Sequence, residues 1–319
     1  MVDIHTDNEL FNMNIFGNSH SIFQIRIKLV LTAIFWGGTF IAGRMVATHL
    51  GPFSAAFLRF FIASVFLLAF TWSSERKIPS LSGRQMLFLA LLGLSGIFAY
   101  NFFFFSGLKT IHAGRAAIII ANNPIFISLF SVIIFREKMT GLRVVGILLS
   151  VSGAIWALSR GDLRLITGQF GVGEFYISMC VVSFVFYTLI GKSVMVNLSP
   201  LVSVSYSSII GTFLLAFPAT QEGLWNQLPG IDLITWLNVF YLGLFGTVLG
   251  FIWYYEGIKN LGPVKASIFI NFVPISAIIL AYFILKEAIT VSLLGGAILV
   301  ITGVSLTNIS RIKQMRSLT

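Results

Sequence analysis

Hydrophobic residues gather in long runs along this chain, and short polar breaks separate the runs. A run of about 20 apolar residues is long enough to cross a hydrocarbon core about 30 Å thick as a helix. The breaks carry Gly/Pro pairs or clustered charges, both of which end helices. The pattern predicts ten membrane-spanning helices, at residues 27–47, 53–73, 85–107, 114–135, 141–159, 172–194, 200–220, 233–257, 263–285 and 289–309.

Composition supports an all-α membrane protein. Hydrophobic residues make up 57% of the 319 residues and charged residues only 10%, whereas an average soluble domain has about 25% charged residues. The apolar runs are also too long for the short alternating strands of a membrane β-barrel. We therefore expect a polytopic protein whose first partner is the lipid bilayer.

The net charge of +10 does not indicate nucleic-acid binding, because the basic residues lie in short connections between spans. Cytoplasmic connections are enriched in Lys and Arg. With the N-terminus inside, fourteen of the 21 Lys and Arg residues fall on the inner side, six fall on the outer side, and Arg59 lies within a span. This bias predicts that both termini are cytoplasmic. We expect the membrane to be a plasma membrane, of the bacterial inner-membrane type.

The chain contains an internal duplication. Residues 93–153 align without a gap on residues 243–303, and sixteen of these 61 positions are identical, including paired Gly, Pro, Lys, Glu and Thr. Each repeat holds five spans, an odd number, so the second copy enters the membrane from the opposite side. We predict two inverted five-helix repeats, at 27–159 and 172–309, between tails at 1–26 and 310–319. This architecture is common in secondary transporters, although duplication can also simply build a larger bundle.

Several short motifs carry a family resemblance. Trp36-Gly37 with Phe40 opens the first span, Arg59-Phe60 lies in the second, and each repeat closes on a Pro…Glu…Gly…Gly series, from Pro124 and from Pro274. In this order they resemble the drug/metabolite transporter superfamily, in particular the ten-span exporters built from two EamA domains. The resemblance spans about residues 28 to 308 and implies efflux of amino acids or other small metabolites without ATP.

Polar residues within the spans are the candidates for a transport pathway. Pro124 and Pro274 each remove a helix hydrogen bond and predict a kink or break. Asn122, Asn123 and Asn271 lie beside these prolines. Their amides either line a polar cavity or hold neighbouring helices together.

Two charged positions within spans have open roles. Arg59 lies about 10 Å inside its span, where an arginine indicates function by default, unless it reaches the interface or pairs with carbonyls. Glu256 is the only acid well within a predicted span, one turn from Lys259. That spacing suits a structural ion pair, and proton coupling is the alternative.

Aromatic residues can line a cavity or simply pack the spans. The pathway candidates drawn from them, with the neighbouring amide, are Trp36, Tyr100, Asn101, Tyr187, Trp253 and Tyr254.

The sequence does not indicate an enzyme. All four histidines fall in tails or loops, no carboxylates are paired within the spans, and the single cysteine, Cys180, lies in an apolar run. We expect no catalytic residues, metal or cofactor. The interpretation is a secondary exporter of a small metabolite, with a non-transporting scaffold or receptor, and more remotely an intramembrane enzyme, as alternatives. Cargo, coupling ion and oligomeric state stay open.

Overall fold

The computed structural model describes residues 5–75, 81–123, 125–126, 129–130, 140–159, 171–194, 198–261, 266 and 269–316. Every regular element in these ranges is a helix. In chain order the elements are α1 (His5–Ala47), α2 (Pro52–Glu75), α3 (Gly83–Leu92), η1 (Gly93–Ala99), α4 (Tyr100–Leu108), α5 (Ala113–Ile120), α7 (Gly141–Leu158), α9 (Val172–Val194), α10 (Pro200–Gln221), α11 (Leu224–Gln227), η3 (Leu228–Gly230), α12 (Leu233–Tyr241), η4 (Leu242–Leu249), α13 (Gly250–Leu261), α15 (Phe272–Leu285) and α16 (Val291–Arg316).

Within the described part of the chain, six helices are long and apolar enough to cross a membrane, at 22–47, 52–74, 83–108, 172–191, 201–221 and 233–254. They coincide with six of the predicted spans. Three shorter apolar helices, at 141–157, 272–285 and 291–307, fall on three more. The remaining predicted span, 114–135, begins with α5 and continues into residues only partly described, so the count of ten stays a prediction.

Helix α1 extends beyond the first predicted span. It begins at His5, within the segment 1–26 predicted as a tail, and continues unbroken to Ala47. Helical geometry therefore extends well before the apolar run.

Side-chain caps fix where several helices begin. Ser82 forms a capping box with Gln85 at the start of α3, and Thr140, Ser199 and Asp232 accept backbone hydrogen bonds at the starts of α7, α10 and α12. Each satisfies an N–H group that the first helical turn leaves unpaired.

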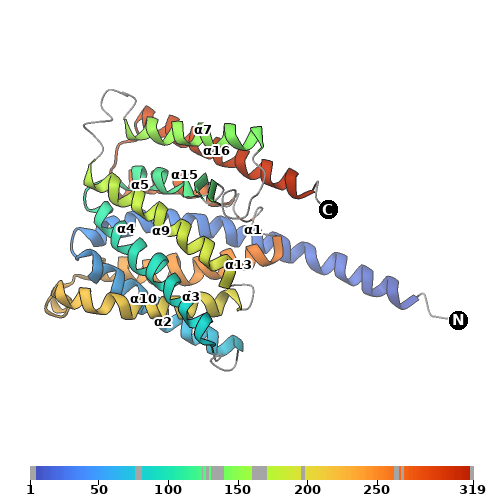
Figure 1. The fold of residues 1–319 in the computed structure, drawn as a ribbon, viewed down its shortest axis with the longest axis horizontal. Helices are drawn as coiled ribbons and strands as arrows, with labels where there is room; N and C mark the ends of the chain where they lie inside the picture. Colours follow the sequence, from blue (N-terminus) through green and yellow to red (C-terminus); the bar gives the residue numbers. More distant parts are fainter. Residues whose placement is uncertain are drawn as a thin grey trace.

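In Figure 1 α1, α7, α15 and α16 run lengthwise through the bundle, α3, α4 and α9 cross it obliquely, and the beginning of α1 and the end of α16 lie at the same end. We call this end the terminus face. The opposite end, with the connections 48–51, 109–112, 222–232 and 286–290, is the turn face. α7 and α16 lie along one edge of the bundle, and α2, α3 and α10 lie along the other (Figure 1).

Helices at matching positions of the two duplicated segments have matching neighbours. A shift of 148 to 150 residues carries α1 onto α9, α2 onto α10, the α3–η1–α4 helix onto α12–η4–α13, and α5 toward α15. α1 packs on α13 and α15, while α9 packs on α4 and α5. Likewise η4 packs on α2, and η1 packs on α10.

Glycines bring α7 and α16 into backbone contact. A Cβ atom added at Gly146 would lie 2.6 Å from the carbonyl oxygen of Gly303, and one at Gly153 would lie 2.8 Å from that of Gly296. No larger side chain fits at such separations, as expected of small residues at membrane helix contacts. The glycines at 146 and 153 therefore allow the close packing of α7 on α16.

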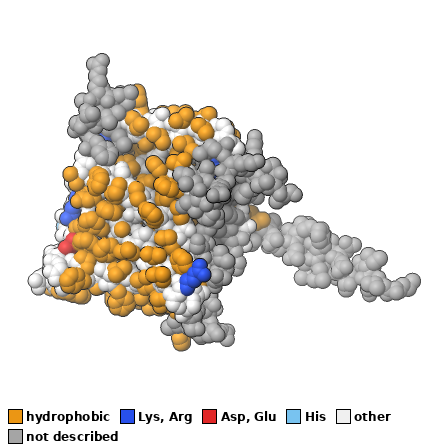
Figure 2. Space-filling model, in the orientation of Figure 1, with side chains coloured by type: hydrophobic (Ala, Val, Ile, Leu, Met, Phe, Trp, Pro, Cys, Tyr) orange, Lys and Arg blue, Asp and Glu red, His pale blue; other side chains and the backbone are white. Residues whose placement is uncertain are grey.

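The outer surface is strongly apolar. In Figure 2 hydrophobic side chains cover most of the coloured part of the visible face, and charged groups lie near its margins. Phe213 and Phe217 on α10 are 76% and 73% exposed. A soluble protein rarely exposes an apolar surface this extensive, so these side chains are placed to contact lipid.

Candidate functional site

Two π-helical segments mark corresponding points of the duplicated helices. η1 covers Gly93–Ala99 and η4 covers Leu242–Leu249. A shift of 150 residues along the sequence aligns 93–99 with 243–249. A π-helix is rare, and such segments occur frequently at functional sites because they widen the backbone and loosen its hydrogen-bond ladder.

Glycines seat both π-helices closely against neighbouring helices. A Cβ atom at Gly93 would lie 3.0 Å from the carbonyl oxygen of Ser207 on α10. The equivalent atom at Gly243 would lie 3.0 Å from the carbonyl oxygen of Arg59 on α2. The two contacts correspond, but one side presents a serine and the other an arginine, so the site is chemically asymmetric.

Arg59 joins the two duplicated segments. It is 7% exposed, its Nε donates to Thr247 Oγ1 at 3.1 Å, and its Nη1 donates to Asn101 Oδ1 at 3.1 Å. Its guanidinium carbon also lies 5.2 Å from the ring centroid of Phe60. Arg59 therefore does not reach an interface; it is held within the bundle between η4 and α4.

The π-helices fix the two acceptors of Arg59. The Asn101 amide nitrogen donates to the carbonyls of Gly96 and Ile97, at 3.3 and 2.9 Å, which leaves its oxygen for Arg59. The Thr247 hydroxyl donates to Leu242 O five residues earlier, at 2.9 Å. Both side chains donate a hydrogen bond to a backbone carbonyl of a π-helix, so their orientation is fixed in the absence of a ligand.

Trp36 is anchored on the residue beside Thr247. Its Nε1 donates to Gly246 O at 3.0 Å, and its ring lies 5.2 Å from that of Tyr254 and 5.5 Å from that of Phe251. A Cβ atom at Gly250 would lie 2.5 Å from Trp36 Nε1. The close approach of α1 to η4 and α13 thus depends on glycine.

A narrow apolar crevice extends from Trp36 toward the terminus face. Too tight for a water molecule in this conformation, it is lined by Leu29, Thr32, Ala33, Trp36, Tyr254, Ala266, Phe269 and Ile270. Two predicted pathway residues, Trp36 and Tyr254, therefore line the same crevice.

The asparagines beside the two prolines have other partners than Asn101 has. Asn122 accepts from Ser150 on α7 at 2.8 Å, and Asn271 donates to Ser305 on α16 at 3.1 Å. Both amides therefore hold neighbouring helices together, one of the two roles left open by the sequence. Asn123 differs, because its buried Oδ1 has no hydrogen-bond partner in the described part of the chain.

The other predicted aromatics pack against rings or backbone. Tyr100 and Tyr187 both lie against Phe184, at 5.9 and 6.1 Å between centroids. Trp253 stacks on Phe35 at 5.6 Å, away from the Trp36–Tyr254 pair.

Glu256 has a partner that the sequence did not indicate. Lys28 Nζ lies 2.8 Å from Glu256 Oε2, and both side chains are more than one-third exposed, at 36% and 37%. The side chain of Lys259 lies outside the described residues, so its predicted pairing stays a prediction.

The helix break before the second proline is visible. α15 begins at Phe272 after a turn at Asn271, which places Pro274 in its first helical turn, where a missing N–H costs little. α5 ends at Ile120, the position equivalent to Ile270. Pro124 itself lies outside the described residues.

A carboxylate links three helices at the turn face. Glu287, after the end of α15, accepts from the backbone N–H groups of Ala113 and Gly114 at the start of α5, at 3.0 and 3.3 Å. It also lies 3.5 Å from Arg44 of α1 and 3.4 Å from His112. Its side chain is only 10% exposed.

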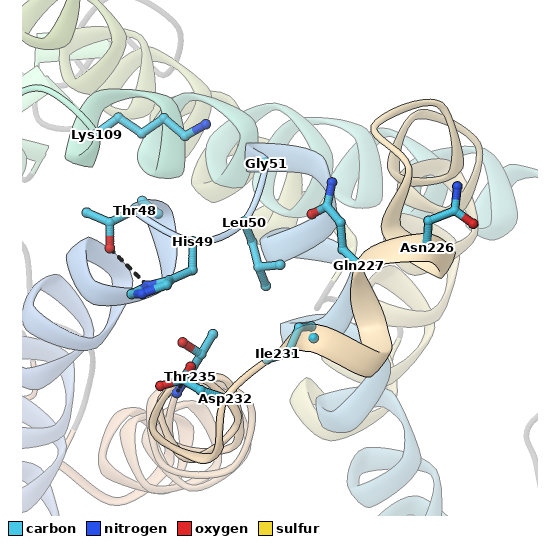
Figure 3. Close-up of a pocket in the computed structure, with 12 residues that line it drawn as sticks. Thr48, His49, Leu50, Gly51, Lys109, Asn226, Gln227, Ile231, Asp232 and Thr235 are labelled. Atoms are coloured by element: carbon cyan, nitrogen blue, oxygen red, sulfur yellow. Dashed lines mark hydrogen bonds between the residues drawn. The ribbon is translucent and has the colours of Figure 1, made fainter.

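Beside this link the turn face is hollowed by a cavity of about 690 Å³. Its polar lining includes Lys109 at the end of α4, His49 after α1, and Asp232 at the start of α12, which surround an open centre in Figure 3. A hydrogen bond from Thr235 lowers the pKa of the Asp232 carboxyl, so this rim holds opposite charges.

Sequence reasoning missed three residues of these sites. These residues are Thr247, Lys28 and Glu287. Each contacts a partner far away along the chain, up to 228 residues for Lys28 and Glu256. The paired glycines at 93/96 and 243/246 were a usable signal for the π-helices, because they recur at one register in both copies.

A family model described as the EamA-like transporter family matches residues 26–159 and again residues 171–309. Among curated proteins, the uncharacterized transporter YyaM of Bacillus subtilis (strain 168) is 30% identical over 282 residues, covering 88% of this chain and 92% of its own. A probable terminal-alkyne amino-acid exporter of Streptantibioticus cattleyicolor is 28% identical over 283 residues, covering 88% and 92%.

The fold also occurs among solved structures. One crystal structure aligns with a TM-score of 0.63 at 17% identity, covering 90% of this chain and 98% of that one. At this identity the likeness concerns the fold alone.

Proposed function

The chain belongs to the EamA-like transporter family, and we propose that it exports small metabolites, such as amino acids or related compounds, by alternating access. Two family units cover almost its whole length. The named function of one relative, amino-acid export, gives the class of cargo to try first.

Alternating access needs two arrangements of nearly equal energy. Duplicated units of opposite orientation provide them, because exchanging the conformations of the two units converts one arrangement into the other. Two observations support this proposal. The helices of the two segments make matching contacts, and the π-helices η1 and η4 occupy corresponding positions in the two segments.

The observation that carries the proposal is the meeting of both segments at η4. Gly246 accepts from Trp36 of α1, and Thr247 accepts from Arg59 of α2, which also holds Asn101 of α4. Intramembrane polar groups that face a bundle interior mark substrate pathways. The proposed pathway passes between Trp36, Tyr254 and Arg59.

The Glu287 link then acts as a latch on the turn face. It ties α15 to α5 and α1 through a buried carboxylate, and opening of this seam requires its release. The positive-inside bias predicts that the terminus face is cytoplasmic, and with that orientation the latched turn face is the outer one.

Flux from proteoliposomes tests the proposal. Vesicles loaded with a defined mixture of amino acids, carboxylic acids, amines and nucleosides are incubated, and the external solution is analysed by mass spectrometry. We expect saturable loss of some compounds, reduced in Trp36→Ala but not in Trp72→Ala, a matched control whose side chain is 60% exposed on α2. Absence of any flux from the folded wild type favours a scaffold or receptor.

A further inference from the structure

Arg59 is a buried cation with no anionic partner among the described residues. The ion pairs of the described residues join Lys28 to Glu256, Glu287 to Arg44 and His112, and Arg115 to Glu174. Arg59 takes part in none of them.

The five acids whose side chains are described are all engaged elsewhere. Glu174, Glu256 and Glu287 are in ion pairs, Glu222 accepts from the first turn of α2, and Asp232 caps α12. The other six acidic residues of the chain lie at positions 3, 7, 9, 75, 137 and 162, in tails or connections of the predicted topology. No described side chain therefore neutralises Arg59.

The hydrogen bonds of Arg59 are also incomplete. A guanidinium has five N–H donors; Nε and Nη1 bond to the neutral oxygens of Thr247 and Asn101, and Nη2 has no hydrogen-bond partner among the described residues. A buried charge is costly unless it is paired and hydrogen-bonded. A carboxylate supplies both requirements, because a guanidinium binds it with two parallel hydrogen bonds.

The surroundings of Arg59 hold it ready for a ligand. Asn101 and Thr247 are fixed by carbonyls of η1 and η4, and the backbone of Arg59 packs so closely on η4 that a Cβ atom added at Gly243 would lie 3.0 Å from the Arg59 carbonyl oxygen. The second segment has Ser207 at the corresponding contact, so the bundle presents one cation here rather than a symmetric pair.

The turn-face cavity lies at the ends of the helices that carry the site. The 690 Å³ cavity is bounded by Gly51 before α2, Lys109 after α4 and Thr235 on α12. Arg59 lies on α2, Asn101 on α4, and Thr247 on η4, which follows α12. Gly51 and Lys109 each lie eight residues from Arg59 and Asn101, or about 12 Å along a helix.

We infer that Arg59 binds an anionic group of the cargo, a carboxylate above all, and that this single cation makes the protein selective for carboxylate-bearing metabolites. This inference rests on the proposed transport function. It adds the chemical class of the cargo and the residue that recognises it.

The test uses the loaded proteoliposomes, with each carboxylic acid in the mixture accompanied by its uncharged amide, for example phenylacetate with phenylacetamide. We expect the exported compounds to carry a carboxylate. We expect Arg59→Gln to lower their flux about 30-fold or more, the range for removing one partner of a buried charge pair, and Arg59→Lys to retain part of it. Arg143→Gln is the matched control, since Arg143 on α7 is also fully buried but lies in another helix layer.

A second variant covers the case in which Arg59→Gln does not fold. Asn101→Asp places a carboxylate 3.1 Å from Arg59 Nη1, where it acts as a tethered counter-ion. We expect it to keep the thermal stability of the wild type and to lower carboxylate flux at least about tenfold by competition. A purely structural role for Arg59 predicts that this variant transports normally.

The outcomes separate the two proposals. Export of amides and acids alike, or undiminished carboxylate export by Asn101→Asp or by folded Arg59→Gln, overturns the inference about Arg59 while transport stands. No export of any compound by folded wild-type protein overturns both.

Discussion

Replacing Glu287 with glutamine should open the turn face. In the structure its two oxygens accept the N–H groups of Ala113 and Gly114, and the carboxylate lies 3.5 Å from Arg44 Nε. Glutamine keeps one acceptor and loses the charge. A hydrogen bond to a charged group contributes about 1.5–3 kcal/mol and a neutral one about 1 kcal/mol.

With the lower value for the two charged hydrogen bonds and about 1 kcal/mol for the one that glutamine keeps, the closed arrangement loses at least about 2 kcal/mol relative to one in which the link is already broken. That difference changes the ratio of closed to open molecules by at least roughly 30-fold. Since a conformational equilibrium shifts only by the difference in interaction between its two states, the full effect requires the link to be absent when the turn face is open.

Thiol labelling measures this shift. Cys180 is the only cysteine, so a Cys180→Ser background accepts a single reporter, Ile278→Cys. Ile278 on α15 is 4% exposed, and its side chain lies 3.5 Å from a Cβ atom built on Gly114. A membrane-impermeant maleimide added at the turn face should label this cysteine about 30-fold faster in Glu287→Gln.

The matched control is Glu222→Gln. Glu222 also binds a helix start at the turn face, accepting from Phe53 N, Ser54 N and Ser54 Oγ at 3.2, 2.7 and 2.8 Å, but it joins the closely packed pair α2 and α10. We expect this control to leave labelling of the Ile278→Cys reporter unchanged. Equal acceleration in both variants, or none in Glu287→Gln, refutes the latch.

Three further substitutions, the first with a matched control, test individual contacts. Gly250→Ala should lower stability by about 1–3 kcal/mol through overpacking, because its Cβ would lie 2.5 Å from Trp36 Nε1, whereas Gly83→Ala, with no atom within 4 Å of the new methyl, should not lower the melting temperature. Lys286→Gly should raise the melting temperature, since Lys286 has φ 58° and a left-handed backbone costs a non-glycine residue about 1–2 kcal/mol. Glu256→Gln should change stability by no more than about 1 kcal/mol, the limit for exposed pairs, and should keep transport active; a loss of flux with intact folding would instead indicate proton coupling.

The sequence predicted most of the helical architecture because long apolar runs and their Gly/Pro breaks are local signals. The duplication added tertiary information: Gly93 and Gly243, aligned by sequence alone, make the same kind of contact with Ser207 and Arg59. The family resemblance, stated from Trp36-Gly37, Arg59-Phe60 and the closing motifs, is confirmed by the family match.

The site itself was only partly predictable. Trp36, Arg59 and Asn101 are predictable because tryptophans, charges and amides within spans are conspicuous. The acceptors of Trp36 and Arg59, Gly246 O and Thr247 Oγ1, lie about 190 to 210 positions away along the chain. Spacing rules for one helix cannot find such partners, and this also explains why Lys28 was not considered for Glu256.

Asn122 and Asn271 illustrate a different limit. An amide next to an intramembrane proline suits a cavity lining and a helix contact equally well on sequence grounds. Only the packing of α7 and α16 assigns these amides to Ser150 and Ser305. The role of an amide within a span is decided by its neighbours, whereas the cost of burying it is decided by its own chemistry.

Counterflow tests alternating access most directly. Proteoliposomes are preloaded with a high concentration of an unlabelled carboxylate that the protein exports, and a trace of the same labelled compound is added outside. A carrier that exposes one site to each side in turn predicts transient accumulation of label above equilibrium, abolished by Trp36→Ala and by Arg59→Gln. A label that only equilibrates, with no overshoot in the wild type, would contradict alternating access.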